Sequence, residues 1–231
     1  MPQVYGKRGW YLIGNDVKQV LLWPILIFCL LLGATGFLLK KISILSIIIF
    51  LIIFGVFFVV AKFFPGSNRY YSGWSGEKEI EEKLKELPED YSLFIDLHLP
   101  GRKDNVDFIV TGQTGIFVVE AKKFKGQIFS TGKDLILNHK IRLDRPLGQA
   151  YRQAKEIEEY LFKVTGKRRK TVPVLAFATR FVGENFKPQN IKGVSVIPRG
   201  FLPYTFFEYQ NQFSLHELQE IEHALKKLVK I

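Results

Sequence analysis

Two long stretches without a charged residue, 21–39 and 42–61, constrain this chain more than any other feature. A helix of about 20 apolar residues spans roughly 30 Å of hydrocarbon, so each stretch is long enough to cross a bilayer. Only Lys40 and Lys41 separate the two stretches, which predicts a tight helical hairpin. The first apolar run is too long for the core of a signal peptide, and a second run follows at once. We therefore expect residues 1–65 to form a membrane anchor with two transmembrane helices.

The distribution of basic residues predicts the orientation of this anchor. The loop between the spans carries two lysines, whereas the flanks on the other side carry six basic residues: Lys7, Arg8, Lys18, Lys62, Arg69 and Lys78. Short cytoplasmic segments are enriched in Lys and Arg, so both termini and the domain after the anchor are expected in the cytoplasm. Neither stretch holds an ionisable residue, so nothing indicates a transport pathway. The expected location is the cell membrane, with the lipid bilayer as one partner.

Composition excludes several other kinds of protein. The 21 Phe, 9 Tyr and many branched aliphatic residues exclude a disordered chain. A single cysteine, Cys29, excludes a disulfide scaffold and a cysteine-based zinc module, and the four His are scattered. Residues 66–75 have the composition of a short Gly/Ser linker with aromatic residues. Because residues 76–231 hold 21 of the 22 acidic residues, we expect a separate soluble domain there.

Hydrophobic periodicity and turn residues predict the elements of this domain. The expected elements are a helix at 77–87, a strand at 92–99, two strands within 105–126, short strands near 127–130 and 133–138, a helix opened by Asp144 and Pro146, strands at 172–179 and 194–197, and a final helix at about 215–230. Ser214 and Glu217 form the capping-box pattern of the final helix. Because the apolar strands alternate poorly, this order indicates an α/β fold with a mixed sheet covered by helices.

The most informative stretch is residues 105–126, whose central Gly-Gln-Thr-Gly predicts a β-hairpin. If the loop consists of residues 113–114, Asp107 lies directly opposite Glu120, with Cβ atoms about 5 Å apart. Lys122 follows Glu120 by two residues and therefore shares its face of the sheet. The hairpin is thus expected to gather two carboxylates and an amine.

Two carboxylates on paired strands repel each other, and a divalent cation between them would remove that repulsion. Oxygen ligands without Cys or His favour Mg²⁺ or Mn²⁺. An ordinary charged strand end, with Lys122 in a salt bridge to the carboxylates, is the alternative. Glu77 lies on the apolar stripe of its helix, although a contact with the helix dipole also explains such a position. Gln149 and Gln153 lie on one stripe of the long central helix, where simple solvation is the alternative.

Together these residues resemble a known family. The residues that carry the resemblance are Gly73-Trp74-Ser75-Gly76-Glu77, Asp107, Glu120-Ala121-Lys122 and Gln149. They are similar to the pattern of the nuclease-related domain (NERD), a family of the PD-(D/E)xK nuclease superfamily. The resemblance covers roughly residues 70–185 and implies a restriction-endonuclease-like mixed sheet flanked by helices. Val106 stands where the superfamily pattern has a proline, a position at which that pattern is loose.

The resemblance also implies roles for these residues. Asp107 and Glu120 would ligate Mg²⁺ or Mn²⁺, and Glu77 would hold a metal-bound water or a second ion. Lys122 would orient or help deprotonate the attacking water and stabilise the charged transition state. Gln149 would steady the site or the scissile strand. The implied activity is hydrolysis of phosphodiester bonds in nucleic acid, with DNA favoured over RNA, and a carboxylate-bound cation can supply the chemistry.

A polyanionic substrate also needs a basic surface along which to approach. The candidate contacts are Lys123, Lys125, Lys167, Arg168, Arg169 and Lys170. For the run at 167–170, a solvated loop or contact with anionic lipid is the alternative.

Two other functions stay open at this point. The first is a catalytically inactive NERD domain that binds nucleic acid or regulates another protein while tethered to the membrane. The second is a membrane scaffold whose hairpin packs against partner helices through the small residues Gly33, Gly36 and Gly55.

Overall fold

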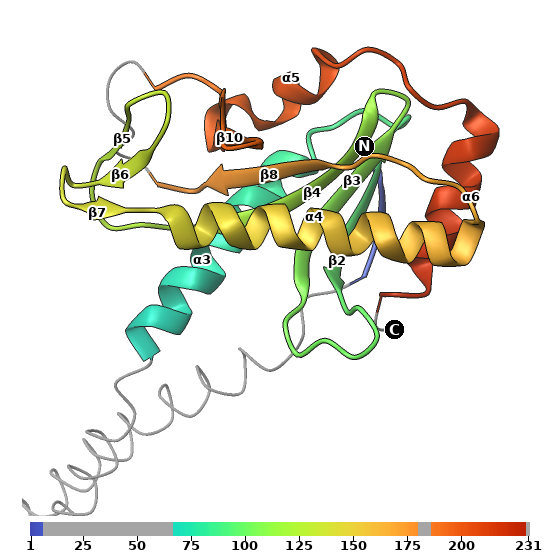
Figure 1. Cartoon of the computed structure of the whole chain (residues 1–231), viewed down its shortest axis with the longest axis horizontal. Coiled ribbons are helices and arrows are strands. Elements are labelled where there is room, and N and C mark those ends of the chain that lie inside the picture. The colour runs from blue at the N-terminus through green and yellow to red at the C-terminus, as the bar shows by residue number, and fades with distance from the viewer. Residues whose placement is uncertain (7–66, 180–185, 230–231) are drawn as a thin grey trace, which may run out of the picture. The chain divides into compact units, whose positions relative to one another are not determined.

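The β-hairpin predicted within 105–126 forms the centre of a mixed sheet. The computed structural model describes residues 1–6, 67–179 and 186–229 (Figure 1). Within them, the strand order is β1-β2-β3-β4-β8-β10-β9, and β4 pairs antiparallel with β3 and parallel with β8. The strands are β1 (Gln3–Tyr5), β2 (Ser92–Leu97), β3 (Val106–Gly112), β4 (Gly115–Lys122), β8 (Val172–Phe177), β9 (Gln189–Ile191) and β10 (Val194–Pro198).

Helices cover both faces of this sheet. One face is covered by α4 (Asp144–Thr165) and α6 (Leu215–Lys226), and the other by α3 (Ser67–Leu84) and, after a 3-10 turn η1 (Arg199–Phe201), by α5 (Leu202–Phe207). Along β4, Val118 packs under α4 and α6, whereas Phe117 packs under α3 and α5. Because both faces are buried, the strands are apolar throughout, which explains their poor alternation. The predicted α/β class, a sheet flanked by helices, is confirmed.

A second sheet of three antiparallel strands follows β4 directly in sequence. Its strands are β5 (Ile128–Ser130), β6 (Leu135–Leu137) and β7 (Ile141–Arg142). Figure 1 shows it beyond the arrowhead of β8 and beside the start of α4. Ile128 and Leu135 share an apolar cluster with Leu147 of α4 and Phe177 of β8. The β5–β7 sheet is therefore packed onto the domain at the edge where β4 and β8 end.

The segment expected to be a linker is helical. Helix α3 begins at Ser67 and runs through residues 67–75 into the predicted helix. Glycine in a helix interior lowers helix stability by about 1 kcal/mol relative to alanine, and Gly73 and Gly76 give this segment its linker-like composition. The burial of Ile80 and Leu84 against the sheet stabilises the helix and overrides that local preference.

The first residues of the chain belong to the sheet and not to the predicted anchor. Strand β1 pairs parallel with β2, with Gln3 opposite Ser92 and Tyr5 opposite Phe94. The Tyr5 ring stacks on that of Phe94, with 4.9 Å between centroids. A strand of three residues is too short to show a period of two, so hydrophobic periodicity could not predict it. The start predicted for the anchor, at residue 1, is therefore wrong.

The two stretches predicted to span the membrane, 21–39 and 42–61, lie outside the described residues. Among the residues that the structure does describe, no helix is long and apolar enough to cross a bilayer. Membrane anchoring, the orientation of the anchor and the location of the protein therefore stay predictions.

The last helix has the predicted start but an earlier end. Ser214 and Glu217 form the expected capping box of α6. The helix ends at Lys226, because the following residues cross to the edge of β2, where the Leu228 carbonyl accepts a hydrogen bond from the His98 N–H at 2.9 Å. Strands β7 and β9 and helix α5, each of six residues or fewer, were not predicted.

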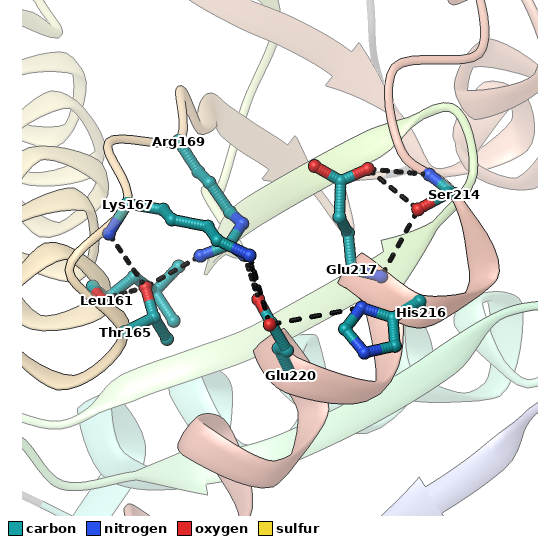
Figure 2. Close-up of polar contacts among 8 residues, drawn as sticks. All are labelled: Leu161, Thr165, Lys167, Arg169, Ser214, His216, Glu217 and Glu220. Carbon is teal, nitrogen blue, oxygen red and sulfur yellow. Dashed lines mark hydrogen bonds and ion pairs between the residues drawn. The ribbon is translucent and has the colours of Figure 1, made fainter.

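The loop after α4 is tied to α6 by a buried arginine (Figure 2). The Arg169 side chain is only 3% exposed and donates to Glu220 Oε2 at 2.6 Å and to Thr165 Oγ1 at 2.7 Å. Lys167 donates to both carboxylate oxygens of Glu220 at 3.0 Å. Glu220 is thus the counter-ion of two basic residues that the sequence analysis predicted to contact nucleic acid.

Substitution of this counter-ion should destabilise the domain. Hydrogen bonds from Lys167 and Arg169 hold the pKa of Glu220 below its usual range, so its stabilising effect is complete above the ordinary glutamate pKa and is lost as pH falls through the lowered value. We expect Glu220→Gln to lower the melting temperature at neutral pH, with a difference from wild type that shrinks in acid. Glu159→Gln is the control, since that exposed carboxylate of α4 has no ion pair within the described part of the chain. Equal melting curves for the two variants would contradict this account.

Candidate active site

The pairing of β3 with β4 has the predicted register. Gly112 pairs with Gly115 and Phe108 with Val119, and the same register continues to Asp107 opposite Glu120. The backbone pairs end at Phe108, because the Asp107 carboxylate takes over as acceptor. Its Oδ2 accepts a hydrogen bond from the Ala121 N–H at 2.9 Å. Asp107 is therefore held against the end of β4.

Glu120 is the buried centre of this group. Glu120 is only 1% exposed, and its Oε1 accepts a hydrogen bond from Lys122 Nζ. Its Oε2 is buried and has no hydrogen-bond partner among the described residues. A buried carboxylate oxygen without a donor is unfavourable, so this oxygen is a candidate ligand for a cation or a water.

The charges of the group act strongly on one another. Burial, followed by the negative charges of Glu120 and Glu77, raises the pKa of Asp107 well above its usual range. Burial lowers the pKa of Lys122, but Glu120 and Asp107 raise it by more, so the lysine pKa is raised overall. The ammonium group of Lys122 is thus the internal counter-charge of the two carboxylates. The ion pair between Lys122 and Glu120 is the salt bridge that the sequence analysis considered as an alternative. The raised pKa of Lys122 favours its protonated form.

Glu77 reaches the group because its helix approaches the end of β4 closely. A Cβ atom on Gly76 would lie 2.6 Å from Cβ of Lys123, a separation that side chains do not tolerate. Lys123 Nζ also donates to Ser75 Oγ at 2.9 Å and to Glu79 Oε1 at 2.6 Å. These contacts fix the α3 segment that carries Glu77, whose charge acts on Asp107 and Lys122.

The two glutamines of α4 differ in their surroundings. Gln153 is 1% exposed and donates to the Asn105 carbonyl at 3.1 Å, two residues before Asp107. Gln149 is half-buried one turn earlier, and within the described residues its side chain has no hydrogen bond to the carboxylates. The structure therefore places Gln153, which is not among the residues that carry the family resemblance, against the loop that leads into β3.

The donor atoms of the site suit a hard cation, but they are not gathered as a ready-made metal site. No group of three or more His, Cys, Asp or Glu with metal-binding geometry occurs in the described residues. The carboxylates of Asp107 and Glu120 are the oxygen ligands that Mg²⁺ and Mn²⁺ prefer. A bound cation would fit both the Oε2 of Glu120, which has no partner among the described residues, and the repulsion that raises the pKa of Asp107.

Three of the basic residues assigned to nucleic acid have partners inside the domain. Lys123 is bonded to α3, while Lys167 and Arg169 are bonded to Glu220. The structure thus gives these side chains structural contacts. The other three candidates, Lys125, Arg168 and Lys170, are exposed.

Comparison with known proteins supports a nuclease-related segment. Residues 72–178, a little under half of the chain, match the family model of the nuclease-related domain. This segment runs from α3 through β8 and contains Glu77, Asp107, Glu120, Lys122 and Gln149.

One curated relative is similar to the chain over part of its length. An uncharacterized protein of Bacillus anthracis is 31% identical over 97 residues, which are 38% of this chain and 46% of the relative. The chain therefore covers less than half the length of that protein. No solved structure matches the chain. The segment at 72–178 is thus similar to the nuclease-related domain, and every carboxylate of the site lies within it.

Proposed function

We propose that this chain is a metal-dependent nuclease that is anchored to the cell membrane and hydrolyses nucleic acid, with DNA as its preferred substrate. The observation that carries the proposal is the opposition of Asp107 and Glu120 beside Lys122, within a segment that matches the nuclease-related domain. Two carboxylates opposite each other on paired strands repel and destabilise the fold, and a bound cation would remove that repulsion. The same match supports a restriction-endonuclease-like arrangement of the sheet.

The surroundings of Asp107, Glu120 and Lys122 support a role for each of these residues. Mg²⁺ or Mn²⁺ held by Asp107 and Glu120 would polarise a phosphoryl oxygen and lower the pKa of a water. The Ala121 N–H holds the Asp107 carboxylate, and Glu120 offers the oxygen that lacks a donor within the described part of the chain. Lys122, with its raised pKa, is suited to donate a hydrogen bond to the phosphate and not to act as a base. The match to the nuclease-related domain supports roles for Glu77 in holding a metal-bound water or a second ion and for Gln149 in steadying the site or the substrate strand.

Anchoring at the membrane rests on the two uncharged stretches, 21–39 and 42–61. The excess of basic residues in the flanks supports a cytoplasmic position for both termini. In this arrangement the nuclease-like domain faces the nucleic acid of the cell interior.

A catalytically inactive nucleic-acid-binding domain is the second candidate. The ion pair between Lys122 and Glu120 favours it, because that pair neutralises one carboxylate without a metal. Cleavage assays separate the two candidates.

Cleavage should require both a divalent cation and Glu120. The full chain, extracted from the membrane fraction with detergent, should cut DNA in Mg²⁺ or Mn²⁺ and lose this activity in EDTA. Glu120→Gln should abolish cleavage and weaken the binding of Mn²⁺ in calorimetry. Lys122→Ala should keep metal binding but cut about 100-fold more slowly, since it removes a donor to the transition state.

Melting curves of each variant serve as the folding control for these assays. Activity that persists in EDTA or in Glu120→Gln would refute the mechanism. Nucleic-acid binding without cleavage would favour the inactive alternative, and recovery of the chain in the soluble fraction would contradict the anchor.

Asp107→Asn should stabilise the metal-free domain. A raised pKa means that the ionised carboxylate opposes folding, so the wild type loses stability as pH rises from the ordinary aspartate pKa through the raised one. In EDTA the melting temperature of Asp107→Asn should exceed that of wild type by a margin that grows with pH and then levels off. In Mg²⁺ the wild type should gain stability and the variant should not. Asp90→Asn, an exposed carboxylate, is the control and should show no such trend.

Gly76→Ala should disturb the site through α3. Its Cβ would overlap that of Lys123 at 2.6 Å, which forces α3 away from β4 and displaces Glu77. We expect a lower melting temperature and reduced cleavage. Gly148→Ala in α4 is the matched control, because a Cβ there meets nothing within 4 Å and should stabilise the helix by up to about 1 kcal/mol. If Gly76→Ala behaved like Gly148→Ala, close approach of α3 would not be required.

A further inference from the structure

The β5–β7 sheet and its surroundings carry more positive charge than their carboxylates neutralise. Among the described residues of this region, the two acidic ones are Asp134 and Asp144, and both are already paired with basic residues. Arg142 contacts Asp134 at 2.8 Å and Asp144 at 3.0 Å, and Lys192 contacts each of them at 2.7 Å. These four residues form a closed, neutral set.

Four exposed basic side chains of the same region remain outside this set. They are Lys125, Lys133, Lys140 and Arg145. In the described part of the chain, none of the four has a carboxylate within ion-pair distance. By contrast, Lys167 and Arg169 of the basic run after α4 are both occupied by Glu220. Among the described residues, a group of unpaired cations therefore lies around the β5–β7 sheet, which follows β4 directly in sequence.

The tip of the β5–β7 sheet is a tight, ordered turn. Asn138 and His139 have φ values of 51° and 56°, and the Lys140 N–H donates to the Leu137 carbonyl at 3.1 Å. The exposed His139 ring lies 3.6 Å from that of Phe129, centroid to centroid. A preorganised surface loses little conformational entropy when it binds.

The root of this sheet is joined directly to the candidate site. Lys122, the last residue of β4, pairs with Phe177 of β8. Two residues later, the Phe124 N–H donates to Thr179 Oγ1 at 3.0 Å, and the Phe124 ring packs 5.6 Å from that of Phe177. A polymer bound along the β5–β7 sheet would therefore lie beside Lys122 and Glu120.

We infer that the β5–β7 sheet is the surface that holds the nucleic-acid backbone next to the site, through Lys125, Lys133, Lys140 and Arg145. This inference rests on the proposed function, in which the site acts on nucleic acid. Unpaired lysines and arginines bind phosphates through charge, independently of base sequence. The surface therefore determines where the substrate lies and how tightly it binds, whereas the carboxylates determine whether it is cut.

The test compares two triple variants of the full chain with equal loss of charge. The arm variant, named for the β5–β7 sheet, is Lys125→Ala, Lys133→Ala and Lys140→Ala. The control variant is Lys103→Ala, Lys163→Ala and Lys227→Ala, three exposed lysines outside that sheet that have no ion pair within the described part of the chain. Binding of a short fluorescein-labelled DNA duplex is measured by anisotropy in EDTA, between about 50 and 200 mM salt. We expect the arm variant to bind about tenfold more weakly and to lower the slope of log K against log salt by about 3, with no such change in the control variant.

The outcomes separate this inference from the proposed function. Replacement of the same three lysines by arginine should restore the wild-type Kd, which excludes a folding defect. Equal Kd values for the arm and control variants, or a wild type that does not bind the duplex, would overturn the inference. A wild type that binds through these lysines but never cleaves would leave this surface supported and would reject the catalytic proposal alone.

Discussion

The repulsion between Asp107 and Glu120 is the interaction on which the rest of the site depends. The register of one hairpin brings the two carboxylates opposite each other where the pairing of β3 with β4 ends. Two hydrogen bonds partly compensate this repulsion: the ammonium group of Lys122 donates to Glu120, and the N–H of Ala121 donates to Asp107. One oxygen of Glu120 still lacks a donor among the described residues, so the compensation inside the protein is incomplete. A site with excess negative charge and an unsatisfied acceptor is prepared for a positive ligand.

The surrounding elements hold this charged group in place from three directions. Lys123, directly after the group, binds Ser75 and Glu79 of α3, and Glu79 also pairs with Arg199 after β10. Gln153 of α4 binds the loop that leads into β3. These contacts connect the ends of three strands and two helices around the carboxylates. Such positioning restricts where the acidic side chains can move, which is what a site with fixed geometry requires.

The sequence predicted the centre of the domain better than its edges. The Gly-Gln-Thr-Gly turn was sufficient for the register, because a two-residue hairpin loop determines which residues of the two strands pair. The signals failed where tertiary contacts override local preference. The glycines of α3 made a helix look like a linker, and three residues of β1 show no period. Lys167 and Arg169 looked available to a ligand, because a counter-ion some 50 residues away is invisible in a local pattern.

The position of β1 constrains the path of the whole chain. Gln3–Tyr5 hydrogen-bond with β2 in the same sheet that α3 covers, so the polypeptide leaves this domain after its first strand and must return to it. Two strands of one sheet cannot lie on opposite sides of a bilayer. Any crossings made by the intervening segment must therefore come in an even number, whatever the distribution of lysines and arginines. The same strand also has a consequence for synthesis. Because β1 leaves the ribosome long before β2, it can join the edge of the sheet only after β2 has been synthesised.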